Sequence, residues 1–456
     1  MPTDPPPTPT ETPIPTESPT PTESPTPSRT PIPASPAVPA TTATPADSPP
    51  HGMFSSMRIR NFRLFFVGQA VSVAGNWMQN VAVGWLVLET THSAIALGAV
   101  AGARFVPLVV FGPWGGLVAD RSDRRKLLLV TQSCCAALSL LLGLLSYVGY
   151  APIAVVVPIV VALGVVNIFD SPARQSIISY LVPREYVANA VALSSISMNT
   201  ARIIGPGVGG ALIATVGITP CFLFNSASFG VVIASVLAMR AAELIPAVRE
   251  GRAKGQIRAG LRYIRETPVL LGPLVMVTVA GTFAWEFQTT LPLMTTGAFH
   301  GNAAVYGTIM SCLGAGSVAG GFFAARRHHH SIRSLAISVA VWGALIIAAS
   351  LAPNVPIEYA LIAFVGSGAI TFNSAAKTLL QVESAPQMRG RVMAVWSIGW
   401  QGSTVLGAPI VGGIAALLGA RAGLAAGGVA ALLVGGFYLV SARVPAPETH
   451  AVTVDP

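Results

Sequence analysis

The chain has 456 residues, of which 52% are hydrophobic and only 10% are charged, and its mean hydropathy is +0.64. A water-soluble protein of this length carries far more charge, so the composition excludes a soluble globular protein. The net charge of +9 is dispersed along the chain and forms no compact basic module, which argues against nucleic-acid binding.

The first predicted segment is a tail at residues 1–57, rich in Pro, Thr and Ser. Proline accounts for 18 of the first fifty residues, and apolar side chains are few. Such a segment cannot bury a hydrophobic core, so we expect it to be disordered. A mucin-like stalk is the alternative. Met53 or Met57 would also serve as the start of the chain, because basic residues suited to the flank of a membrane helix follow them.

A series of nearly uncharged segments follows the tail, and each is long enough for a bilayer-spanning helix of about 20 residues. The segments 131–169 and 203–239 are too long for one helix and break at turn signals around Pro152 and Pro220. The sequence therefore predicts an all-α membrane protein with twelve transmembrane helices and short loops. Their predicted centres are residues 75, 107, 138, 163, 201, 230, 280, 314, 342, 368, 403 and 432.

The basic residues predict the orientation of these helices. Lys and Arg total 27, and 23 of them fall at the cytoplasmic helix ends if both termini are cytoplasmic. This distribution follows the positive-inside rule. It predicts a multi-pass protein of the inner (plasma) membrane with both termini in the cytoplasm.

The chain also repeats itself at an offset of 203 residues. Phe169–Arg174 corresponds to Phe372–Lys377, and Pro206 corresponds to Pro409. This predicts two pseudo-symmetric, parallel halves of six helices, an architecture typical of secondary transporters. The predicted parts are the tail, an N-terminal half at 58–240, a basic cytoplasmic linker at 241–265, a C-terminal half at 266–443 and a C-terminal tail at 444–456.

A charged stretch, GGLVADRSDRRK at 115–126, interrupts the apolar sequence between the second and third predicted helices. It resembles the signature loop of the major facilitator superfamily, Gly-x-Leu-Ala-Asp-Arg-x-Gly-Arg-Lys/Arg. Asp123 replaces the second glycine, as in the branch of drug–proton antiporters that includes the enterobactin exporter and macrolide efflux proteins. The resemblance covers about residues 58–443. The matching residues are Gly116, Ala119, Asp120, Arg121, Arg124 and Arg125.

The resemblance implies the major facilitator fold and a gating role for this loop. In that fold Asp120 accepts hydrogen bonds from the N-terminus of the eleventh helix, where the helix dipole is positive. We expect Arg124 or Arg125 to pair with Asp170, so that the cluster latches the two halves when the cavity faces outward. The alternative is that these charges only anchor the topology. The predicted gating residues are Gly116, Asp120, Arg121, Arg124, Arg125 and Asp170.

The fifth predicted helix carries Gly-Pro-Gly-Val-Gly-Gly at 205–210. Gly205, Pro206, Gly209 and Gly210 resemble the motif that marks drug–proton antiporters within the superfamily. Proline lets the helix bend and glycine lets helices approach closely, so helix packing alone is the alternative reading. The resemblance favours export.

Three charged residues fall inside predicted helices, where charge is costly and tends to be functional. We expect Glu286 to carry the coupled proton or to be the counter-charge for a cationic ligand group, with Arg104 and Arg202 nearby. A fixed ion pair with an arginine is the alternative. An apolar pocket with a few polar anchors suits amphiphilic ligands. The predicted cavity-lining residues are Asn76, Gln79, Asn80, Trp85, Asn167, Asn199, Phe283, Trp285, Gln288, Phe372 and Asn373.

The sequence as a whole predicts a proton-coupled exporter of small amphiphilic molecules such as a drug, a macrolide or a siderophore. The expected partners are this substrate, protons and the lipid bilayer, and the expected state is a monomer without cofactor or metal. A nucleotide-driven pump would need a phosphate-binding loop, and an enzyme would need clustered catalytic groups. An importer of the same superfamily and a non-transporting membrane protein remain the alternatives.

Overall fold

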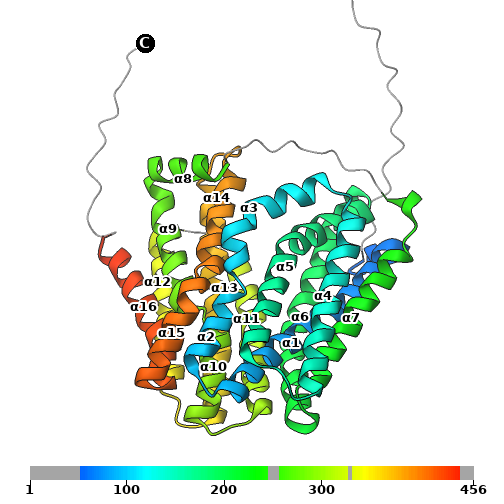
Figure 1. The fold of residues 1–456 in the computed structure, drawn as a ribbon. Coiled ribbons are helices and arrows are strands. Elements are labelled where there is room, and N and C mark those ends of the chain that lie inside the picture. The colour runs from blue at the N-terminus through cyan, green and yellow to red at the C-terminus, as the bar shows by residue number, and fades with distance from the viewer. Residues whose placement is uncertain (1–51, 245–255, 327–330, 442–456) are drawn as a thin grey trace, which may run out of the picture. The chain divides into compact units, whose positions relative to one another are not determined.

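The structure is a computed structural model that describes residues 52–244, 256–326 and 331–441. In these ranges every regular element is a helix, and the long helices run alternately up and down a bundle (Figure 1). Most of the predicted N-terminal tail, the middle of the predicted linker and the C-terminal tail lie outside the described residues.

Two sets of helices follow one another along the chain. The first set is η1 (Ser55–Arg58), α1 (Arg60–Thr91), α2 (Ala94–Ala103), α3 (Val106–Arg121), α4 (Arg124–Tyr147), α5 (Ile153–Leu181), α6 (Arg184–Val216), α7 (Thr219–Leu237) and η2 (Ala241–Glu243). The second set is α8 (Gln256–Glu266), α9 (Pro268–Val279), η3 (Ala280–Ala284), α10 (Phe287–Leu293), η4 (Met294–Ala298), α11 (Ala303–Ala325), α12 (Ile332–Ser350), α13 (Val355–Val382), α14 (Arg389–Ser397), η5 (Ile398–Gly402), α15 (Thr404–Leu418) and α16 (Ala420–Ser441).

Ten helical segments of the described chain are long and apolar enough to cross a membrane, with mean hydropathies from 1.4 to 2.5. Each contains one of the predicted helix centres. The other two predicted centres, residues 75 and 201, fall in α1 and α6, which have 32 and 33 residues. These two helices carry amide and hydroxyl side chains along their length and are not among the ten. The structure is thus an all-α bundle of membrane-spanning character.

The alternating helix directions gather basic residues at one end of the bundle. Arg60, Arg124, Arg184 and Arg389 are the first residues of α1, α4, α6 and α14. The short helix α8 lies at this end, at the top of Figure 1. Its Tyr263 hydroxyl accepts a hydrogen bond of 3.1 Å from the backbone N–H of Ala385. We call this the basic end and the other the opposite end.

Asp123 shows why the turn between α3 and α4 needs no glycine. Its φ of −64° is ordinary for any residue, and its carboxylate accepts from the backbone N–H groups of Arg125 at 2.9 Å and Lys126 at 3.3 Å. The side chain is therefore the N-cap of α4 and satisfies two N–H groups that lack partners within the helix. Aspartate at this position caps α4 with its carboxylate, and glycine has no side chain that could do so.

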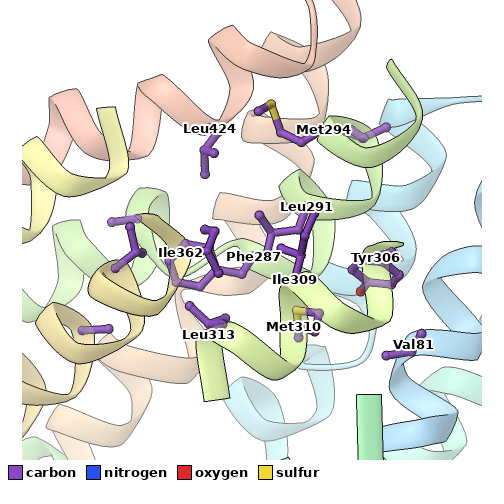
Figure 2. Close-up of a cluster of buried hydrophobic side chains, with 14 of the residues drawn as sticks. Val81, Phe287, Leu291, Met294, Tyr306, Ile309, Met310, Leu313, Ile362 and Leu424 are labelled. Carbon is purple, nitrogen blue, oxygen red and sulfur yellow. The ribbon is translucent and has the colours of Figure 1, made fainter. Parts of the chain in front are cut away.

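The largest hydrophobic core lies along α1, α10, α11 and α13 and extends to α12 and α16. Figure 2 shows part of it, where Tyr306, Met310 and Leu313 of α11 lie near Phe287 and Leu291 of α10. Beside this cluster the aromatic rings of Trp342, Phe372 and Trp400 lie within 6.2 Å of one another, centroid to centroid. These rings fix α12, α13 and η5 together.

Candidate functional site

Two of the interrupted spans have a charged residue at the break. Arg104 is the C-cap that directly follows α2, and Pro107 lies at the second position of α3, where proline supplies no N–H to continue the helix. Glu286 directly precedes α10, after the π-helical turn η3 that ends at Ala284. Turns of this kind are frequent at functional sites. The breaks therefore place Arg104 and Glu286 where a straight helix would not.

Arg104 lines a first cavity, which has an empty volume of about 480 Å³ with its open mouth included. Nη1 of Arg104 donates to Oδ1 of Asn80 on α1. Gln79 and Gln288 contribute two further amides, and Oε1 of Gln79 accepts a 2.8 Å hydrogen bond from Asn225. We call this the Arg104 cavity. Its other lining residues are Val83, Gly84, Leu97, Val100, Ala101, Val160 and Leu163.

Arg202 and Glu286 line a second cavity, with an empty volume of about 610 Å³ including its open mouth. The Arg202 guanidinium lies 5.4 Å from the centroid of the Trp77 ring, in the geometry of a cation–π interaction. Nε of Arg202 is buried and has no hydrogen-bond partner. We call this the Glu286 cavity. Its other lining residues are Trp77, Ala101, Phe105, Trp285, Phe287, Gln288, Met310, Leu313, Gly314, Ser317 and Thr404.

The Glu286 side chain is only 4% exposed, and its Oε1 has no hydrogen-bond partner. Thr404, at the start of α15, lies beside the carboxyl group. Among the described residues no salt bridge joins Glu286 to Arg104 or Arg202. The fixed ion pair considered from the sequence is therefore not formed in this conformation, although Arg202 and Glu286 line the same cavity.

The predicted lining residues separate into two groups. Gln79, Asn80, Trp285 and Gln288 line the two cavities. The structure places the rest elsewhere, because each helix presents several polar or aromatic faces and the sequence does not say which one turns inward. The residues that line neither cavity are Asn76, Trp85, Asn167, Asn199, Phe283, Phe372 and Asn373.

Three of these residues have clear roles outside the cavities. Phe372 is fully buried and stacks on Trp342 at 5.9 Å, so it belongs to the core of the second helix set. Trp85 is buried as well, stacks on Tyr306 and donates to Glu89 at 3.1 Å. Asn76 donates to the Ser72 carbonyl within its own helix.

The sequence reasoning missed several residues that face the cavities or the interior. Trp77 is adjacent to the predicted Asn76, and Thr404 precedes the repeated Gly-Ala-Pro of 407–409. Glu358 is a second buried carboxyl group, with 0% exposure and no hydrogen-bond partner on either oxygen. It lies in the first turn of α13, so in sequence it looked like the charged flank of a helix.

The Gly-Pro motif of α6 packs this helix between α1 and α11. A Cβ at Gly205 would lie 2.7 Å from Cβ of Trp77, and one at Gly209 would lie 3.1 Å from Cα of Met78. A Cβ at Gly210 would overlap the Ala303 carbonyl of α11. The glycines thus allow the close approach that holds Trp77 beside Arg202.

The predicted gating loop is only partly described, since the side chains of Gly116, Asp120 and Arg121 lie outside the described residues. Asp170 is buried and accepts from Thr131 at 2.9 Å and from Gln132 at 2.7 Å, and it pairs with Arg174 at 3.6 Å. Such a network satisfies the buried carboxylate from its own half of the bundle. Among the described residues neither Arg124 nor Arg125 forms a salt bridge with Asp170 in this conformation, so the pairing expected for an outward-facing latch stays a prediction.

The two predicted arginine partners of Asp170 bind other groups. Arg124 donates to the Ser176 hydroxyl at 2.7 Å and lies over the Tyr180 ring. Arg125 donates to the carbonyls of Val236 and Leu237 at the end of α7. Both therefore tie the start of α4 to neighbouring helices at the basic end.

Two close contacts between the helix sets lie toward the opposite end. Gly98 near the start of α2 contacts the Ala408 carbonyl of α15, and Gly210 near the end of α6 contacts Ala303 and Gly307 of α11. Since α2 and α11 begin at the opposite end and α6 finishes there, both contacts seal the bundle on that side.

Comparison with known proteins gives matches along nearly the whole chain. The model of a family described as transmembrane secretion effectors matches residues 51–455. The staphyloferrin A transporter of Staphylococcus aureus is 26% identical over 260 residues, which cover 56% of this chain and 64% of that protein. The enterobactin exporter EntS of Escherichia coli O1:K1 / APEC is 24% identical over 393 residues, which cover 83% of this chain and 91% of that protein.

Solved structures share the fold at low identity. A bacterial homologue of the human lysosomal transporter Spinster, in an inward-facing and unoccupied conformation, has a TM-score of 0.67 at 14% identity. The nucleoside transporter NupG has a TM-score of 0.61 at 13% identity. Each similarity covers 84% of this chain and 96% of the other.

Proposed function

We propose that this chain, which belongs to the transmembrane secretion effector family of the major facilitator superfamily, exports small amphiphilic organic molecules in exchange for protons. The observation that carries the proposal is the Glu286 cavity, where a buried carboxyl group and a buried guanidinium face one space between aromatic side chains. Drugs, macrolides and siderophores are the ligand classes that such a cavity fits.

The proposed architecture has twelve spans in two six-helix halves. It adds α1 and α6 to the ten apolar segments, because their lengths suffice for a bilayer and α1 buries its polar side chains Gln69, Ser72 and Gln79 within the bundle. The halves are residues 58–240 and 266–443, and they are joined by the linker at 241–265. The basic end is assigned to the cytoplasm by the positive-inside rule, with both termini on that side.

In this proposed orientation the contacts of Gly98 and Gly210 would close the extracellular side, which supports an inward-open assignment of the described conformation. Alternating access would then break these contacts and close the cytoplasmic side. The gating loop of Gly116, Asp120, Arg121, Arg124 and Arg125, with Asp170, is proposed to form its latch between the halves in the outward-open state.

Glu286 is the proposed proton carrier. Its carboxyl group lies at a helix break and lines a cavity together with Trp77 and Arg202 of the first half, and so is positioned to respond when the two halves move. Taking up a proton from outside and releasing it inside would link proton entry to ligand exit. An importer would use the same machinery, and the sign of transport separates the two functions.

The names of two relatives, an exporter and a siderophore transporter, support export and a siderophore-like ligand. The Gly-Pro motif of α6 supports the same direction through its resemblance to antiporters. Neither argument depends on the cavities, so the direction and the site can be tested separately.

The test is intracellular accumulation of a panel of dyes, macrolides and catechol siderophores in cells with and without the protein. We expect lower accumulation with the protein, and a rise when a protonophore collapses the proton gradient. Accumulation above that of control cells would reverse the direction. A protonophore effect equal in both cell lines would contradict proton coupling.

A further inference from the structure

We infer that the Arg104 cavity is an anion subsite, which holds a carboxylate or another anionic oxygen group of the ligand while the Glu286 cavity takes its apolar body. The inference rests on the proposed transport function and specifies the ligand class. The anionic group and the apolar body of the ligand would then bind in two cavities and not in one amphiphilic pocket.

The first argument is the charge of the Arg104 cavity. Arg104 is the one charged side chain among its lining residues. In the part of the chain that the structure describes, its guanidinium forms no salt bridge. A cation in an apolar span without a counter-charge is costly. An anionic group of the ligand would supply that counter-charge.

The second argument is which hydrogen-bonding atoms of the amides around Arg104 already have partners. Oδ1 of Asn80 already accepts from Arg104, and Oε1 of Gln79 already accepts from Asn225. Each oxygen thus already accepts one hydrogen bond, whereas the NH₂ groups of Asn80 and Gln79 donate to no described acceptor. These NH₂ groups and the remaining N–H groups of the Arg104 guanidinium are donors and suit a ligand group that only accepts.

The third argument is the connection between the two cavities. Ala101 and Gln288 line both, so the cavities adjoin. The Glu286 cavity contributes the rings of Trp77, Phe105 and Trp285, which suit an aromatic or apolar body. A ligand with an anionic head and an apolar body spans both cavities, and its charge lies in the cavity that has no carboxylate.

The geometry of the helix break supports a built site. The Arg104 carbonyl packs directly on Gly164 of α5, and Pro107 prevents α2 from continuing straight. The backbone of Arg104 is thereby fixed by its packing, and Asn80 holds the guanidinium. A held guanidinium loses little freedom on binding, which favours recognition of a carboxylate.

The test uses two dyes with the same xanthene body and opposite charge, carboxyfluorescein and rhodamine 123. Their binding to the purified full-length protein in nanodiscs is measured by fluorescence polarisation. Arg104→Gln should weaken carboxyfluorescein binding by about tenfold or more and leave rhodamine 123 binding unchanged. Arg104→Lys should give an intermediate loss, because it keeps the charge but not the planar fork.

The matched control is Arg421→Gln, which removes a positive charge that binds the Ser350 carbonyl outside both cavities. It should change neither affinity. Equal loss of both dyes in Arg104→Gln, or unchanged carboxyfluorescein binding, would overturn the inference. If no Arg104 variant folds, benzoate should displace carboxyfluorescein from the wild-type protein and tetraphenylphosphonium should not; the reverse order would overturn it.

Cell accumulation of the same dyes separates this inference from the proposed function. Arg104-dependent anion binding without any difference in dye accumulation would refute export and keep the subsite. Export of rhodamine 123, together with no wild-type binding of carboxyfluorescein, would keep export and refute the subsite.

Discussion

The break at Arg104 lies in the first helix set and the break at Glu286 in the second, and the two charged groups differ in their partners. At Arg104 the helix is interrupted by proline, and the guanidinium already has an amide partner in Asn80. At Glu286 a π-helical turn makes the break, and one carboxyl oxygen is buried without a partner. Arginine keeps its charge in proteins, whereas a carboxyl group can change its protonation. We therefore propose ligand recognition as the role of the break at Arg104 and proton coupling as the role of the break at Glu286.

The largest expected effect is at the second break. Glu286→Gln keeps the size of the side chain but cannot exchange a proton, so efflux should lose all response to a protonophore. Glu358→Gln is the matched control, because Glu358 is equally buried but lines neither cavity. Accumulation of rhodamine 123 with and without protonophore is the measurement. Wild-type sensitivity in Glu286→Gln would remove Glu286 from the coupling.

Sequence reasoning identified the charges at both breaks but not the breaks themselves. Arg104, Arg202 and Glu286 stand out because charge is rare in apolar segments, and all three line cavities. The π-helical turn before Glu286 has no comparable signal, since it packs against α15, α16 and η5, which are distant from it in sequence. The same limit applies to the cavity walls. Phe372 and Trp285 look alike in sequence, yet Phe372 is in the core and Trp285 lines a cavity.

The next largest effect is expected from Gly→Ala substitutions that crowd the backbone at one break or the other. A Cβ at Gly164 would overlap the Arg104 carbonyl, and one at Gly281 would lie 2.6 Å from the Gly399 carbonyl beside the other break. Overpacking of this kind costs about 1–3 kcal/mol. Gly164→Ala should therefore weaken carboxyfluorescein binding and keep protonophore sensitivity, whereas Gly281→Ala should reduce that sensitivity. The two readouts are dye polarisation and cell accumulation. Identical phenotypes would show that the breaks do not act separately.

A smaller effect is expected from the partner of Arg104. Asn80→Ala removes the amide that orients the guanidinium, and carboxyfluorescein affinity should fall about fivefold, or by about 1 kcal/mol. Asn76→Ala is the control on the same helix, since Asn76 donates only to the Ser72 carbonyl. Polarisation titrations of both variants give the affinities. An equal loss in Asn76→Ala would indicate a general disturbance of α1.

For the gating loop, the sequence predicted which residues matter but not which groups they contact. The family pattern identified its charged residues, but the capping role of Asp123 follows only from the φ of this residue and its two accepted hydrogen bonds. The partners of Asp170 could also not be predicted from the sequence, because Thr131 and Gln132 lie on α4 about two turns beyond Arg124 and Arg125. Local patterns predicted which residues matter here, and packing decided what they contact.

The smallest expected effect lies outside both breaks, at Asp123. Asp123→Ala removes the N-cap of α4 and should lower the free energy of unfolding by about 1 kcal/mol, whereas Asp123→Gly should cost only a few tenths. Thermal unfolding of the purified variants gives the order, and neither variant should alter dye affinity or protonophore sensitivity. An equal loss for both would mean that the carboxylate does not stabilise the helix as a cap. A change in dye binding would mean that the loop reaches the cavities even in the inward-open state, and the two breaks could then no longer be treated as independent of the gate.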